Sequence, residues 1–77
     1  PLPHPVILRA GEPLPAVGPR REFLRAVSEG DAVRLAGSQD SSALSALAVA
    51  DCLIDRPAGA PPVPAGAPVP VFRLQNG

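Results

Sequence analysis

The sequence predicts an all-β domain, a small barrel-like bent β-ribbon that carries one short helix. Three observations lead to this prediction. The apolar runs are short, several of them alternate with polar residues, and prolines and glycines separate them. The chain has 12 Pro and 7 Gly among 77 residues, which disfavours long helices. We expect residues 1–5 to be a proline-rich linker, residues 6–74 to be the domain and residues 75–77 to be a tail.

The first strand is expected over residues 6–10, where Val6, Ile7 and Leu8 form an apolar run. Residues 11–19 follow with three prolines and two glycines. Because proline and glycine interrupt regular pairing, this segment is expected to be a loop.

A β-hairpin is expected next. Residues 21–27 alternate, so Phe23, Arg25 and Val27 share one face of a strand. Gly30 tolerates a positive φ and predicts a tight turn. Residues 32–36 then return as the second strand of the pair.

The second half of the chain is expected to hold the helix and two more strands. Leucines at helical spacing predict two or three helical turns over residues 41–50. A short buried strand is expected over residues 52–54, and residues 56–68, with five prolines, are expected to be a loop. The last strand is expected over residues 69–74, where Pro70 favours an edge position because proline cannot donate to a ladder.

Composition excludes several functions. There is no Lys, which rules out a Schiff-base or P-loop lysine, and one His and one Cys cannot build a zinc site from this chain alone. Seven Arg balance seven acidic residues and only two residues are aromatic, so we expect no nucleic-acid partner. No apolar run approaches the ~20 residues of a membrane span, so we expect no membrane partner. Neither a signal peptide nor a disulfide framework is visible, and we expect a cytoplasmic protein.

Arginines form the first candidate site. Arg20, Arg21 and Arg25 cluster near the start of the hairpin. Guanidinium groups suit oxyanions, but most surface arginines are only solvated or paired with carboxylates, here with Glu22, Glu29 or Asp31. Arg25 is the strongest candidate because it shares a face with apolar residues.

Serines form the second candidate site. Ser38, Ser41 and Ser42 stand around the start of the expected helix. Hydroxyl and backbone N–H groups at such a position can bind anions, although ordinary N-capping is the more common role of such serines. Asp40 would place a negative charge beside this site. His4 is expected to be an exposed linker residue, and Cys52 an inert buried thiol.

Three blocks of the sequence, in order, resemble one known family. Residues 18–26 (GPRREFLRA) resemble a Gly-Arg-x-Glu/Asp-Phe-x-Arg strand. Residues 37–54 resemble a Gly-x-Gln-Gly-Ser block followed by Leu-x-Ser-Leu-Ala and Ala-Asn-Gly-Leu-Ile. Residues 64–71 resemble an Ala-Gly-Glu-x-Val-x-Val turn and strand. Together they resemble domain IV, the C-terminal domain of the molybdopterin molybdenumtransferases, the MoeA and gephyrin E-domain family.

The resemblance implies a function for the longer protein of which we interpret this chain, which contains no Met, to be a piece. Enzymes of this family insert molybdate into adenylylated molybdopterin, with magnesium, and work as homodimers. Domain IV would form one wall of a cleft whose other wall is the central catalytic domain of the other subunit. The domain alone is expected to be inactive and to bind no cofactor or metal. Magnesium, molybdate and adenylylated molybdopterin would belong to the parent enzyme.

The resemblance also assigns residues. Arg25 and Ser41 match family positions that face the cleft, and they are the expected substrate- or anion-binding residues. Arg20, Ser38 and Ser42 are secondary candidates, and no catalytic residue is expected in this chain alone.

Two other interpretations of the sequence remain open. Asp40 stands where the family has glycine, which favours a non-catalytic structural or protein-interaction β module of a divergent paralogue. The chain could also be a weakly ordered, proline-rich linker.

Overall fold

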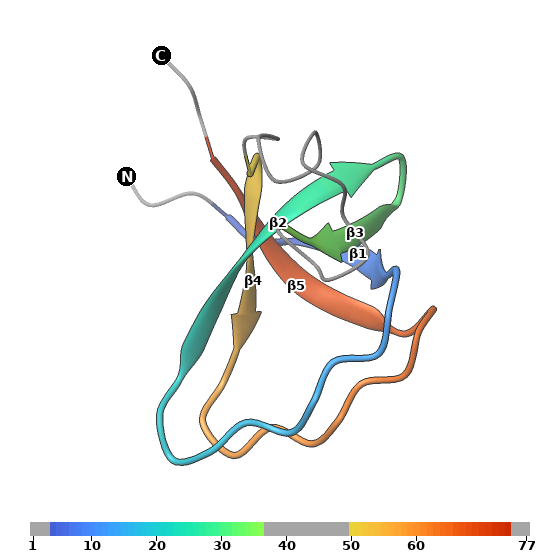
Figure 1. The fold of residues 1–77 in the computed structure, drawn as a ribbon. Coiled ribbons are helices and arrows are strands. Elements are labelled where there is room, and N and C mark those ends of the chain that lie inside the picture. The colour runs from blue at the N-terminus through green and yellow to red at the C-terminus, as the bar shows by residue number, and fades with distance from the viewer. Residues whose placement is uncertain (1–3, 37–49, 75–77) are drawn as a thin grey trace.

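The computed structural model of the chain describes residues 4–36 and 50–74, which form five strands and no helix (Figure 1). The strands are β1 (Val6–Ala10), β2 (Glu22–Glu29), β3 (Ala32–Leu35), β4 (Cys52–Arg56) and β5 (Pro68–Arg73). Every strand expected from the sequence is confirmed, with ends that differ by two residues at most. The helix expected over residues 41–50 lies outside the described residues, except for Ala50, which is not helical.

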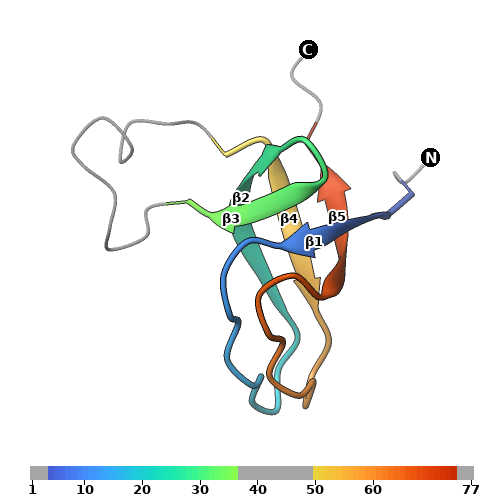
Figure 2. The same cartoon turned by 90° about the vertical axis from the view of Figure 1, so that its right-hand side faces the viewer.

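The five strands close into a barrel in the order β1-β3-β2-β4-β5, and Figure 2 shows the barrel from the side of β1 and β5. All neighbouring pairs are antiparallel except β1 and β3, which run parallel. The all-β, barrel-like class predicted from the sequence is therefore confirmed.

Side chains that point inward from alternate positions of each strand fill the barrel. Since successive side chains point to opposite faces, every second residue enters the core. In β2 the inner residues are Leu24 and Ala26, whereas Phe23 and Arg25 point outward. The prediction that Phe23 and Arg25 share one face is confirmed, and the structure shows that this face is the outer one. The buried core consists of Leu8, Ala10, Leu14, Ala26, Val33, Cys52, Ile54, Val69 and Val71.

The β2–β3 hairpin turns on two residues, Gly30 and Asp31, because Glu29 is already paired with Ala32. Gly30 has a φ of 60°. Asp31 does not have a positive φ. A positive φ at the first central position alone is typical of a type II′ turn, whose twist matches that of the strands.

The two proline-rich connections pair with each other below the barrel and form a second, irregular ribbon (Figures 1 and 2). Leu14 and Val63 exchange backbone hydrogen bonds of 2.8 and 2.9 Å, and the Gly59 N–H donates to the Gly18 carbonyl over 2.8 Å. Residues 57–67 form a loop, as the sequence predicted, and the Leu14–Val63 pairing is an isolated bridge within it. The bridging residues are those between the prolines, which keep their N–H groups.

Arg56 ties this ribbon to the barrel. Its side chain points inward at the end of β4, and the residue is only 4% exposed. Nη2 of Arg56 donates to the carbonyl oxygens of Pro15 and Pro61, over 2.7 and 2.9 Å. A buried cation needs such acceptors to offset its desolvation, so Arg56 joins one connection to the other.

Pro70 does not lie at a sheet edge, contrary to the expectation from sequence, because β5 pairs with both β1 and β4. The Leu74 N–H donates to the Asp51 carbonyl, so even-numbered residues of β5 direct their N–H toward β4. Pro70 faces the same side, but the β4–β5 pairing stops at Val71. The β4–β5 ladder thus ends at the position where Pro70 has no N–H to donate.

The barrel closes at a short seam between β1 and β3, with only two paired positions. Beyond them the Gly11 N–H donates to the Val33 carbonyl over 2.7 Å. Glu12 then turns its side chain back, and its Oε2 accepts from the Leu35 N–H over 2.8 Å. The Glu12 carboxylate thus accepts the backbone hydrogen bond that β1 would accept if it continued beside β3.

The Asp51 carboxylate likewise accepts hydrogen bonds at the end of a ladder, here from β2. The β2–β4 ladder ends at Ala26 and Cys52, and the Asp51 carboxylate accepts from the Ser28 N–H (2.8 Å) and from Oγ of Ser28 (2.7 Å). These hydrogen bonds favour the charged form. They lower the pKa of Asp51 below its ordinary value of 3.8, against a smaller opposing effect of burial.

We predict that Gly11→Ala destabilises the chain by about 1–3 kcal/mol. A Cβ at this position would lie 2.8 Å from Cγ of Arg34 and 3.0 Å from the Val33 carbonyl oxygen, which would push the seam apart. Gly18→Ala is the matched control, because a Cβ there meets nothing within 4 Å. Urea unfolding of both variants measures the difference, and equal loss of stability in the two would contradict the seam's role.

We predict that Asp51→Asn lowers the free energy of unfolding by about 1 kcal/mol at pH 6. Since the folded pKa of Asp51 lies below 3.8, its contribution is fully present above that pH and is lost as the pH falls through the folded value. The gap between the wild type and Asp51→Asn should therefore narrow in strong acid.

Urea unfolding at pH 6 and at pH values below 3.8 measures this gap. Asp31→Asn serves as the control because the Asp31 side chain is 80% exposed in its ion pair, and such pairs contribute little. A gap for Asp51→Asn that stays constant across this pH range would show that the carboxylate charge is unimportant.

Candidate functional site

Arg25 points outward from the middle of β2, where its side chain is exposed. In register it lies opposite Leu53 of β4, and Phe23 and Val27 flank it along its own strand. Within residues 4–36 and 50–74, no carboxylate oxygen lies within 4.0 Å of its guanidinium nitrogens. In the described part of the chain, therefore, an apolar frame surrounds a cation that is free to bind an anion.

The backbone beside Arg25 holds both ends of the segment that carries the candidate serines. The Ala36 N–H donates to the Arg25 carbonyl over 3.0 Å, and the Asp51 N–H donates to the Ala26 carbonyl over 3.1 Å. The chain thus leaves β3 and returns to β4 on the two sides of β2, at the level of Arg25. Ser38, Ser41 and Ser42 themselves lie outside the described residues.

Arg20 is exposed in the turn before β2. It precedes Arg25 by five positions of mostly extended chain, which corresponds to roughly 16 Å. The structure therefore does not bring these two predicted arginines to one point.

Arg21 is not solvated as an isolated charge, and its partner is not one of the acidic residues expected from sequence. Its Nε and Nη2 donate to the two carboxylate oxygens of Asp55, over 2.8 and 2.6 Å. This bidentate pair lowers the pKa of the Asp55 carboxyl, chiefly through the hydrogen bonds from Arg21. Burial opposes this shift, and the charge of Arg21 adds a smaller lowering. Asp55 is 8% exposed, so its charge needs a partner such as Arg21 to offset the cost of burial.

The same guanidinium lies over an aromatic ring. Cζ of Arg21 is 5.1 Å from the centroid of the Phe23 ring, which is a cation–π distance. The Phe23 ring in turn contacts Phe72 of β5, with centroids 6.3 Å apart and planes tilted by 58°. Phe23 remains 50% exposed. Arg21, Asp55 and the two phenylalanines therefore form an ordered cluster on the outer face of β2, β4 and β5.

The other two exposed ion pairs are isolated. Arg9 and Asp31 are joined over 3.3 Å, and Arg34 and Glu29 over 3.0 Å, with all four side chains more than half exposed. Pairs of this kind contribute up to about 1 kcal/mol each, so neither fixes the geometry of a site.

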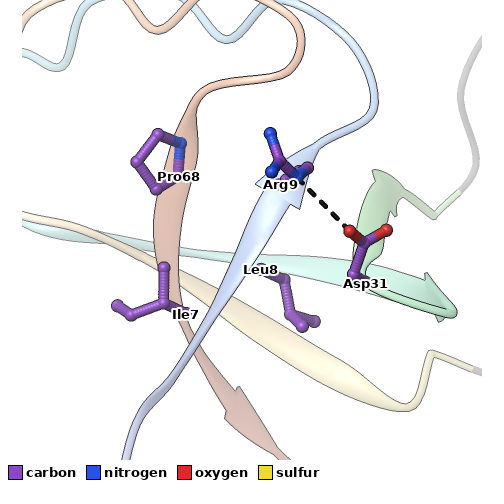
Figure 3. A pocket seen from close by; sticks show the side chains of 5 residues that line it. All are labelled: Ile7, Leu8, Arg9, Asp31 and Pro68. Carbon is purple, nitrogen blue, oxygen red and sulfur yellow. Dashed lines mark hydrogen bonds and ion pairs between the residues drawn. The ribbon is translucent and has the colours of Figure 1, made fainter.

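A hollow of about 340 Å³ lies on the other side of the barrel, between β1, the start of β5 and the β2–β3 turn (Figure 3). Ile7, Leu8 and Pro68 line it, and the Arg9–Asp31 ion pair forms its rim. Because the charges of Arg9 and Asp31 offset each other, the hollow has no uncompensated charge with which to select a ligand.

Cys52 is buried, as expected from the sequence. Its Sγ lies 3.4 Å from the Ala26 carbonyl oxygen, toward which the thiol donates. Burial raises the pKa of the thiol to about 12, with a smaller contribution from the neighbouring Asp51. The thiol is therefore protonated and is not a nucleophile at neutral pH. His4, also as expected, is exposed.

Magnesium, which the resemblance implies for the parent enzyme, finds no ligand set in the described part of the chain. Residues 4–36 and 50–74 contain no group of three or more His, Cys, Asp or Glu side chains that could hold a metal ion. Asp51 and Asp55 are already engaged by Ser28 and Arg21. The same residues contain no helix long and apolar enough to cross a membrane.

Of the comparisons with known proteins, the family scan gives a match. A search of curated proteins found no match. A scan against protein-family models matched residues 8–74, which span all five strands except the first two residues of β1, to the MoeA C-terminal region (domain IV).

Proposed function

This chain belongs to the MoeA C-terminal region (domain IV) family, a domain of molybdenum cofactor biosynthesis enzymes, and we propose that it forms one wall of an inter-subunit active-site cleft. In the proposed reaction the parent enzyme, a molybdopterin molybdenumtransferase, inserts molybdate into adenylylated molybdopterin. The contribution of this domain is to bind and orient an anion.

The state of Arg25 is the observation that carries the proposal. Its guanidinium is exposed in the middle of β2 and has no ion-pair partner within the described ranges, whereas Arg21 and Arg34, the arginines of the same outer face, each have one. A planar guanidinium can donate two parallel hydrogen bonds to molybdate or to a phosphate. The apolar neighbours of Arg25 reduce competition from water, which strengthens such bonds.

Ser41 is the second proposed anion-binding residue, and Ser38 and Ser42 remain secondary candidates. Their support is the chain path, because the segment that carries them begins at Ala36, next to Arg25. Ser41 follows Ala36 by five residues, and five residues span at most roughly 18 Å. A serine hydroxyl within reach of the guanidinium could donate a further hydrogen bond to the same oxyanion. Arg20, the remaining secondary candidate, gains no such support from its position.

The other elements of the proposal concern the parent protein. The opposite wall of the cleft would be the central catalytic domain of the other subunit of a homodimer, in the cytoplasm. Magnesium would be held there, because residues 4–36 and 50–74 bring together no group of three or more His, Cys, Asp or Glu side chains that could hold a metal ion. This domain alone would not catalyse the transfer.

A structural or protein-interaction module is the second candidate function. The observation that favours it is the exposure of large apolar side chains, 50% for Phe23 and 40% for Leu74. Exposed aromatic residues near arginine are typical of protein interfaces. This candidate predicts that removing the Arg25 charge leaves cofactor formation unchanged.

We predict that Arg25→Ala in the full-length parent enzyme lowers molybdate-dependent cofactor formation at limiting molybdate by at least about tenfold. A hydrogen bond to a charged group is worth about 1.5–3 kcal/mol, and tenfold corresponds to about 1.4 kcal/mol. Dimerisation should be intact, as measured by size-exclusion chromatography. Arg34→Ala is the matched control, since it removes an outer-face arginine that already has a carboxylate partner. Unchanged activity in Arg25→Ala would reject the anion-binding role.

A further inference from the structure

We propose that β1 binds an extended segment of another polypeptide beside Ile7, as one further strand, and that the hollow of Figure 3 receives an apolar side chain of that segment. The site is an interaction surface on β1 and the β2–β3 turn, and it involves none of the candidate anion-binding residues. Its partner is an extended stretch of chain whose central residue is uncharged and aliphatic.

The backbone groups of β1 alternate in direction along the strand. The Ala10 N–H donates toward β5, to the Ala67 carbonyl over 2.8 Å, whereas the Arg9 N–H donates to the other side, to the Asp31 carbonyl over 2.7 Å. Because successive residues of a strand direct their N–H and C=O groups to opposite sides, Ile7 directs both groups to the same side as Arg9. The N–H and C=O of Ile7 therefore point away from β5.

No strand lies beside Ile7 on that side in the described part of the chain. β3 pairs with β1 only at Arg9 and Ala10, since β3 begins at Ala32. Among the described residues, neither the N–H nor the C=O of Ile7 has a backbone partner. Ile7 is also 64% exposed. A strand edge with an accessible, unpaired donor and acceptor is a template for pairing with another chain.

The free groups of Ile7 match one residue of an antiparallel strand. In antiparallel pairing a single opposite residue accepts from the Ile7 N–H and donates to the Ile7 C=O, whereas parallel pairing divides the two bonds between different residues. Pro5, the next residue with the same direction, has no N–H. The described edge thus offers one complete donor–acceptor pair, which suits a short segment in antiparallel orientation.

The hollow gives one side chain of that segment a place to pack. It has a volume of about 340 Å³, and its apolar walls are Ile7, Leu8 and Pro68. Residues paired across two strands place their side chains on the same face of the sheet. The partner residue opposite Ile7 would therefore direct its side chain toward the hollow that Ile7 lines (Figure 3). Since these walls are aliphatic, a leucine-sized aliphatic side chain gains most from burial there.

The rim of the hollow disfavours a charged residue at the centre of the segment. Arg9 and Asp31 form an ion pair over 3.3 Å. A carboxylate placed between them would be repelled by Asp31, and an ammonium group by Arg9, so each would lose much of its attraction to the opposite charge. An aliphatic residue disturbs neither member of the pair. The charge distribution therefore favours a neutral central residue.

A second copy of this chain is a less suitable partner than a linear segment. Stable protein–protein interfaces bury roughly 1,200–2,000 Å² in total. One paired residue beside a single hollow covers only a small part of that area, so this edge would not hold two folded domains together. Linear peptides that add a strand to a sheet edge obtain their affinity from main-chain hydrogen bonds and their specificity from pockets for alternate side chains. Ile7 and the adjoining hollow supply one of each.

The test titrates the 77-residue chain with the peptide acetyl-Gln-Thr-Leu-Thr-Gln-amide, with amide chemical shifts as the readout. The shifts should centre on Ile7, Arg9 and Asp31. A peptide with glycine in place of leucine should bind about tenfold more weakly, because the hollow would cover on the order of 50 Å² of the leucine side chain. A peptide methylated at the leucine nitrogen cannot donate to the Ile7 carbonyl, and it should not bind.

Two variants of the chain complete the test. Ile7→Ala keeps the backbone groups but removes a wall of the hollow, so the leucine peptide should lose most of its advantage over the glycine peptide. Leu74→Ala is the matched control, because it shortens an exposed aliphatic side chain elsewhere, and it should leave both affinities unchanged. Dispersed amide shifts verify that each variant is folded.

Each part of the proposal has an outcome that would overturn it. Equal affinities for the leucine and glycine peptides would reject the role of the hollow, and undiminished binding of the methylated peptide would reject strand pairing at Ile7. Shifts centred on Phe23 and Arg25, or no binding of the leucine peptide, would reject the site. Shifts at Ile7 that depend on the concentration of the chain alone would identify a second copy as the partner and reject the linear segment.

Discussion

The barrel depends on its narrowest seam, where β1 and β3 run parallel over two paired positions. Every other neighbouring pair is antiparallel and longer. A closed sheet must satisfy the backbone groups at its seam or leave them unpaired beside the core. Here Gly11 allows close approach of the two strands, and the Glu12 side chain accepts the hydrogen bond that a longer β1 would have taken. The direction of Arg25 follows from alternation along β2, whose residues Leu24 and Ala26 face the core that this closure encloses.

The strands could be predicted from the sequence because their signals are local. Alternation placed Phe23 and Arg25 on one face, and Gly30 marked the turn, since both properties depend on neighbouring residues alone. The pairing of Leu14 with Val63 could not be predicted, because 49 positions separate these residues and the prolines around them argue against a strand. The prediction that Pro70 lies at a sheet edge was wrong for a related reason. The sequence does not show where the ladder between β4 and β5 ends, and this ladder ends next to Pro70.

The candidate site likewise has one residue that the sequence predicts and one contact that it does not. Arg25 was predicted because an arginine among apolar residues on one strand face is visible in the sequence. The partnership of Arg21 with Asp55 was not, since it depends on the register between β2 and β4. That register gives Asp55 a structural role and leaves Arg25 without a carboxylate partner in the described part of the chain. The placement of Asp55 on β4 therefore explains both the ordered ion pair with Arg21 and the availability of Arg25 for an anion in the described part of the chain.

Cys52 offers an internal reporter of how the domain opens. It is the only cysteine of the chain, and it is 0% exposed between β2 and β5. A thiol-specific reagent can reach it only after β4 separates from a neighbouring strand, so the labelling rate would measure the fraction of molecules in which the barrel has opened. The protein thus carries, without any added probe, a chemical means of timing its own unfolding.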